Sequence, residues 1–109
     1  MNLIDYLKSG ERPVQVQQVN VPEWGEFGDA VYVRTLSTAA VMGARSDDPL
    51  ANILYTIIQC VCDKDGKAYF TDADRDQLSK EPLPVMTRLA VAANKLNEQY
   101  ELAEEIEGN

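Results

Sequence analysis

The sequence predicts a small α+β domain that is mainly helical, with about four to five helices and an N-terminal β-hairpin packed on them. Three observations support this prediction. Two short stretches near the N-terminus alternate apolar and polar residues, as strands do. Two later stretches repeat apolar residues at helical spacing. A chain of 109 residues is long enough for one modest core and too short for two, so we expect a single domain over 1–109.

The first predicted element is a short helix over 2–9. Leu3, Ile4 and Leu7 are spaced to cover one face of this helix, and Gly10 is suited to its C-terminal end. An apolar face of this kind normally packs against other elements. We therefore expect the helix to lean on the core through these three side chains.

The first predicted strand begins after Pro13, which cannot continue a helix. Its apolar residues occupy even positions at first and odd positions later. We therefore expect a bulge or a twist near 17–18, where the phase changes. Pro22 lacks an amide donor, so pairing should end there or lie at an edge. The alternating residues are Val14, Val16, Val19 and Val21.

The second predicted strand covers 30–35, and the loop before it forms a long aromatic hairpin tip. The loop contains Trp24 and Phe27. Its glycines, Gly25 and Gly28, are free to take positive φ. Two interpretations of the aromatic residues are open. They form a lid folded back over the core, or they form an exposed anchor in a protein interface, a role in which tryptophan is common.

The centre of the chain predicts two further helices. Ser37 can cap a short helix from about 38 to 44. Pro49 is suited to the first position of the next helix, whose apolar residues recur every three or four positions. We expect this second helix to be the central core helix. Its apolar stripe consists of Leu50, Ile53, Leu54, Ile57, Ile58 and Val61.

The remaining elements are a turn, a short capped helix and a long helix. Residues 63–67 are expected to form the turn, and Thr71 to cap a short helix anchored by Leu78. The long helix follows Pro82 and ends at Asn97. Its repeating residues are Leu83, Met86, Leu89, Ala90, Ala93 and Leu96.

The last segment, 98–109, is expected to be a frayed or partner-dependent acidic helix. Tyr100 and Ile106 lie on its apolar side among several glutamates. Those glutamates form either a solvated face or a contact for a basic partner. Candidate residues for partner binding or self-assembly therefore lie in two regions, the hairpin and this segment. They are Trp24, Phe27, Tyr32, Arg34, Tyr100 and Ile106.

Composition argues against several classes of function. A net charge of -8 opposes binding to nucleic acid or to an anionic membrane. No apolar run approaches the roughly 20 residues of a membrane span, and 1–10 lacks the apolar stretch of a signal peptide. We therefore expect a cytosolic protein in which Cys60 and Cys62 are structural thiols. The chain has no histidine, which removes the commonest general base.

No catalytic, cofactor or metal site is expected. A calcium loop starting at Asp63 would need glycine at its sixth position and glutamate at its twelfth. The chain has Ala68 and Asp74 there. Cys60 and Cys62 offer two sulfur atoms to a metal, but no further cysteine or histidine completes a tetrahedral set. The chain is therefore expected to act by binding rather than as an enzyme.

Five short motifs occur in order along the chain from about Val14 onward. They are the segments 21–25, 31–36, 62–66, 70–74 and 89–93, the last followed by Leu96 and Asn97. In this order and spacing they resemble the tail assembly chaperones of long-tailed (siphophage-type) bacteriophages and prophages.

The resemblance implies a non-enzymatic protein that binds the tape measure protein and the major tail tube protein during tail morphogenesis. It also implies self-assembly into a homo-oligomer, a minor longer product of ribosomal frameshifting, and action in the host bacterial cytoplasm without retention in the virion. Two alternatives are a structural tail or neck protein retained in the virion and a small acidic regulatory protein.

Overall fold

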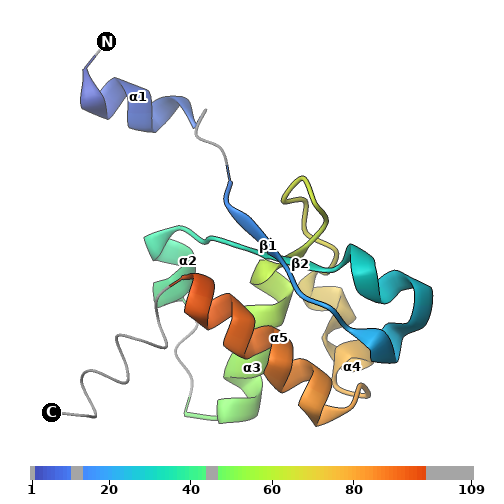
Figure 1. Ribbon diagram of the computed structural model, residues 1–109. Helices are drawn as coiled ribbons and strands as arrows, with labels where there is room; N and C mark the ends of the chain where they lie inside the picture. Colours follow the sequence, from blue (N-terminus) through green and yellow to red (C-terminus); the bar gives the residue numbers. More distant parts are fainter. Residues whose placement is uncertain (1, 11–13, 44–46, 98–109) are drawn as a thin grey trace, which may run out of the picture.

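The computed structural model describes residues 2–10, 14–43 and 47–97 (Figure 1). Its arrangement confirms the predicted α+β class, in which a hairpin precedes the main helices. The predicted features at Pro13, Ala44 and 98–109 lie outside the described residues.

In chain order the elements, with η for 3-10 helices, are α1 (Leu3–Ser9), β1 (Val16–Gln18), η1 (Pro22–Ala30), β2 (Tyr32–Arg34), α2 (Thr38–Met42), α3 (Pro49–Cys60), β3 (Val61–Cys62), η2 (Asp72–Asp74), α4 (Arg75–Leu78) and α5 (Leu83–Leu96).

The three strands form an antiparallel sheet in the order β1, β2, β3. β1 pairs with β2 in an unbroken register, in which Gln17 lies opposite Val33. The same register continues beyond β1, because the Val19 amide donates to the Val31 carbonyl at 2.9 Å. The bulge predicted near 17–18 is therefore wrong.

The valines of the first strand shift from even to odd positions because the two ends of the strand place their valines on opposite faces of the sheet. Val19 is buried on the core face, opposite Val31. Val14 and Val16 lie on the other face, beside the turn that contains Gly66. A Cβ atom on Gly66 would approach side-chain atoms of Val14 to 3.3 Å and of Val16 to 3.7 Å. The strand thus packs valines on both faces of the sheet while its register with β2 stays unbroken.

The loop between β1 and β2 is the 3-10 segment η1, interrupted at Gly25, where φ is 61° and ψ is -132°. Gly28 does not take positive φ. It is required for a different reason, since a Cβ atom there would lie 2.0 Å from the Val21 carbonyl oxygen. The Val21 amide also donates to the Gly28 carbonyl at 3.2 Å, which closes the base of the loop.

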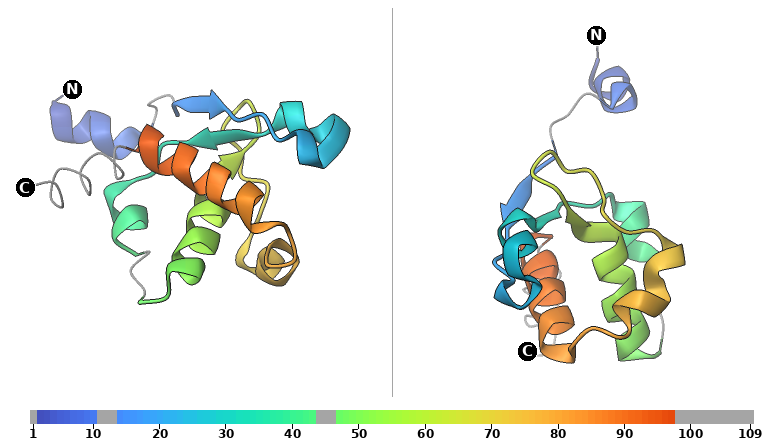
Figure 2. Two further views of the ribbon diagram at one scale, coloured as in Figure 1. Left: turned by 60° about the horizontal axis from the view of Figure 1, so that its bottom comes forward. Right: turned by 90° about the vertical axis from the view of Figure 1, so that its right-hand side faces the viewer.

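Helices α3 and α5 lie side by side and pack against the sheet (Figure 2). The N-terminus of α3 forms as predicted, with Pro49 in its first turn and Asp48 accepting a hydrogen bond from the Leu50 amide at 3.0 Å. Ile57 of α3 and Leu89 of α5 are both fully buried at 0% exposure. The helix pair therefore supplies the centre of the core.

Several residues at the helix ends differ from the prediction. α3 ends one residue earlier than predicted. Val61, the last residue of the predicted stripe, is fully buried but belongs to β3, where it pairs with Val33 of β2. Leu50 and Leu83 are 55% and 54% exposed, because each lies in the first turn of its helix, where the predicted stripe runs past the core. Val85, which lies outside the predicted stripe, is also fully buried, so the packed face of α5 is wider than predicted.

Helix α1 forms where the sequence predicts it, with the Asn2 side chain capping its start and Gly10 in the left-handed region at its end. It does not lean on the core, so that prediction is wrong. Leu3, Ile4 and Leu7 are 73%, 54% and 40% exposed, and no residue of α1 is buried. In Figure 1 the helix lies apart from the sheet and from α3 and α5. Local capping defines α1, while its apolar face meets no other described element.

The shorter elements follow the local signals. Ser37 caps α2 by accepting a hydrogen bond from the Ala40 amide. Thr71 and Asp74 form a capping box at the start of η2, and Leu78 at the end of α4 is buried at 2% exposure. These predictions are confirmed because caps and turns depend on near neighbours in the chain.

Candidate functional site

The hairpin tip is fastened to the helical part of the domain by two side-chain contacts. Trp24 is half-buried against the core, and its indole Nε1 donates to the Glu81 carboxylate at 2.6 Å. Arg88 donates two hydrogen bonds to the Glu23 carboxylate, at 2.8 and 2.7 Å. Phe27 remains 70% exposed on the same loop. The tip therefore covers the core at Trp24 and presents Phe27 to solvent.

The Glu23–Arg88 ion pair predicts a pH dependence. Its hydrogen bonds hold the pKa of Glu23 at about 2, below the ordinary 4.5. Because the folded pKa is lowered, the pair stabilises the fold above about pH 4.5 and ceases to do so as the pH falls towards 2. We expect the wild type to exceed Glu23→Gln in free energy of unfolding at neutral pH, and the small difference to vanish on acidification.

Urea denaturation at a series of pH values measures this difference. Glu26→Gln, in the same loop, is the control and should show no comparable change with pH. A wild-type advantage over Glu23→Gln that stayed constant down to about pH 2 would contradict the assignment.

Arg34, a candidate for partner binding, is already engaged inside the fold. Its Nε donates to the Gln59 carbonyl and its Nη1 to the Gly66 carbonyl, both at 2.9 Å. The guanidinium thereby joins β2 to the last turn of α3 and to the turn after β3. Tyr32 precedes it by two residues on the same face and is half-buried opposite Cys62. Arg34 thus holds elements of the fold together, and the role of both residues towards a partner stays a prediction.

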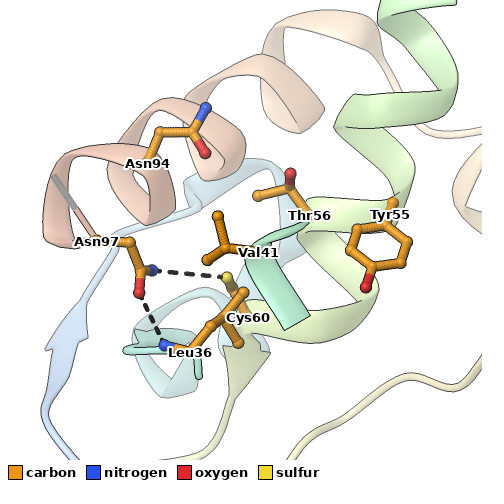
Figure 3. Close-up of a pocket in the computed structure, with 7 residues that line it drawn as sticks. All are labelled: Leu36, Val41, Tyr55, Thr56, Cys60, Asn94 and Asn97. Carbon is orange, nitrogen blue, oxygen red and sulfur yellow. Dashed lines mark hydrogen bonds between the residues drawn. The ribbon is translucent and has the colours of Figure 1, made fainter. Parts of the chain in front are cut away.

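Asn97 connects the end of α5 to the sheet, a role that the sequence did not reveal. Its Oδ1 accepts a hydrogen bond from the Leu36 amide at 2.7 Å, and its Nδ2 donates to the Arg34 and Ala93 carbonyls at 3.2 and 2.9 Å. Figure 3 shows the hydrogen bonds that join this side chain to Leu36 and to the Cys60 sulfur. The cavity beside it measures about 10 Å³, room for about one water molecule, so it is too small for a cofactor.

Cys60 and Cys62 are buried free thiols, as the sequence predicts. Burial raises the pKa of the Cys60 thiol to about 12 and also raises that of Cys62. Because the thiolate is the reactive form, we expect an aromatic disulfide reagent at mildly alkaline pH to modify neither cysteine in the folded chain. Both should react once the chain is denatured. Rapid release of the reagent's chromophore by the folded protein would contradict this.

An apolar groove of about 230 Å³ opens between the first turns of α3 and α5 and the end of α4. The sequence did not reveal it, because helical spacing assigned both of its exposed leucines, Leu50 and Leu83, to the core. Leu78 and Met86, which also line the groove, are buried. A groove of this kind suits an apolar side chain from another protein. The remaining lining residues are Ile53, Leu54, Ser79 and Glu81.

Other kinds of site find no support in the part of the chain that the structure describes. Among those residues no group of three or more metal-ligating side chains comes together. No helix within the same ranges is long and apolar enough to cross a membrane. Two of the candidate binding residues, Tyr100 and Ile106, lie outside the described residues.

The fold is similar to a solved structure, the tail assembly chaperone of bacteriophage HK97. The match has a TM-score of 0.56 and 26% sequence identity, and it covers 76% of this chain and 85% of that chain. No protein-family model and no curated protein matches the chain. The similarity in fold agrees with the order of the five sequence motifs. The chain therefore resembles the tail assembly chaperone family both in its fold and in the order of its motifs.

Proposed function

We propose that the chain is a tail assembly chaperone that binds the tape measure protein and tail tube subunits while a phage tail is built. It self-associates, acts in the host bacterial cytoplasm by binding rather than catalysis, and is left out of the finished virion. The observation that carries this proposal is the similarity in fold to the bacteriophage HK97 chaperone over 76% of this chain.

The groove between α3, α4 and α5 supplies a site for the tape measure protein. A long helical client rich in apolar residues would aggregate if its apolar side chains stayed in water. Leu50 and Leu83 are each more than half exposed at the groove. Burying each of them against a client helix would contribute about 1 kcal/mol. The net charge of -8 keeps the chain soluble while the groove is open.

A pull-down with this chain as bait tests the proposal. The prey are the tape measure protein and the tail tube protein encoded beside its gene, each expressed in soluble form with the bait. Recovery of either one supports the proposal. With both prey well expressed, recovery of neither would overturn it.

Mass spectrometry of purified particles separates a chaperone from a structural protein of the tail or neck. A chaperone is expected to be missing from mature particles and present in the lysate. Detection at the copy number of the tail components would favour the structural protein instead.

A further inference from the structure

Two apolar surfaces of this chain have no covering element among the described residues. One is the face of α1, where Leu3, Ile4 and Leu7 are 40% to 73% exposed. The other is the α3–α4–α5 groove, where Leu50 and Leu83 are more than half exposed. A helix with one leucine- and isoleucine-bearing face is the usual occupant of such a groove.

We propose that α1 of one copy lies in the α3–α4–α5 groove of a second copy. This inference rests on the self-association included in the proposed function, and it names the two surfaces that meet. The groove is then occupied by α1 of a neighbouring copy until a client helix displaces it.

The length of α1 argues that it needs a surface to pack on. It has seven residues, and helices shorter than about 12 residues are only marginally stable in water. Capping by Asn2 contributes about 1 kcal/mol, which does not replace an apolar contact. Burying its exposed leucines and isoleucine in a groove supplies the missing stabilisation.

The position of α1 argues for the groove of a second copy. The groove lies at the first turn of α3, whereas Val14, just before β1, lies beside Gly66, beyond the last turn of that helix. α3 has 12 residues and is therefore about 18 Å long. In both figures that show the whole chain, α1 extends from the end of the domain away from its own groove.

Charge also favours this contact over others between copies. In the segment 1–13, Asp5 and Glu11 are balanced by Lys8 and Arg12, so the net charge of -8 lies on 14–109. The acidic segments 14–109 of two copies repel each other, whereas the neutral segment 1–13 of one copy can approach the other copy without this repulsion. Each copy has one α1 and one groove, so the contact is heterologous and can extend into a ring or a chain of copies.

Cross-linking between two different variants tests the proposal. Leu7→Cys chains are mixed with Leu50→Cys chains and treated with a short bismaleimide; the native cysteines are buried. A covalent dimer is expected that contains one chain of each variant. Val91→Cys, at 47% exposure on α5 outside the groove, replaces Leu50→Cys as the control and should give little dimer. No dimer, or an equal yield with the control, would overturn the proposal.

The double variant Leu7→Cys/Leu50→Cys distinguishes a neighbour's groove from the chain's own. A cross-linked product of monomer size in dilute solution, with no dimer in the mixture of single variants, would place α1 in its own groove and overturn the proposal. Dimers in the mixture, even if the pull-down recovers no client, would leave this inference standing and remove only client binding.

Sedimentation velocity supplies a second measurement. Leu3→Ser/Leu7→Ser should weaken self-association by at least about tenfold. The unfolding temperature of the monomer should not change, because no residue of α1 is buried. Asp5→Asn/Lys8→Gln, on the same helix, should associate like the wild type. Serine variants that associate as strongly as the wild type would overturn the proposal.

Discussion

Replacing Leu89 by alanine is expected to lower the free energy of unfolding by about 2–5 kcal/mol. Leu89 is fully buried on α5 and belongs to the same core cluster as Ile57 of α3 and Val33 of β2. The truncation removes apolar contacts and leaves a cavity at the junction of the helix pair and the sheet. Since a domain of this size has about 5–15 kcal/mol of stability in total, the loss is a large fraction of it.

Urea denaturation followed by circular dichroism measures this loss. Val91→Ala on the same helix is the matched control, because Val91 is 47% exposed and its truncation should cost less than about 0.5 kcal/mol. Similar losses for both variants would mean that α5 does not bury the face described here.

Replacing Gly28 by alanine is expected to cost about 3 kcal/mol. The added Cβ atom would lie 2.0 Å from the oxygen and 2.7 Å from the carbon of the Val21 carbonyl. Both are backbone atoms, so the base of η1 must open and the Val21–Gly28 hydrogen bond must lengthen. Trp24 then loses its packing on the core, and the fluorescence of this single tryptophan should report the change.

The control for Gly28→Ala is Glu26→Ala, at an exposed position of the same loop, which should change stability by less than about 0.5 kcal/mol. Both variants are compared with the wild type by urea denaturation followed by tryptophan fluorescence. A Gly28→Ala protein with wild-type stability and fluorescence would show that the loop base can widen freely.

The sequence predicts those parts of the fold whose causes are local. Pro49 marks the start of α3, Ser37 caps α2, and Thr71 caps η2, because each acts on backbone groups within a few residues. Helical spacing also predicts both long helices, and it identifies α3 as the central core helix. It does not define how far along each helix the core extends, so Leu50 and Leu83 were wrongly assigned to the interior.

The features that the sequence could not predict depend on contacts between distant segments. Asn97 bonds to Leu36, which is 61 residues away, and Gly28 is required by the approach of the Val21 carbonyl. The groove exists only where α3, α4 and α5 meet. Among the predicted binding residues, Arg34 proves to be engaged within the fold, whereas Phe27 stays exposed.

The central claim is that the α3–α4–α5 groove holds an apolar client helix. It is tested most directly by co-purifying the tape measure protein with the wild type and with Leu50→Asp/Leu83→Asp. Both leucines are more than half exposed, so the double variant should fold, and an unchanged unfolding temperature confirms this. Val91→Asp, outside the groove on α5, is the control.

The account predicts that the wild type and the control recover the tape measure protein, and that the groove variant recovers at least about tenfold less. Equal recovery by all three would contradict it.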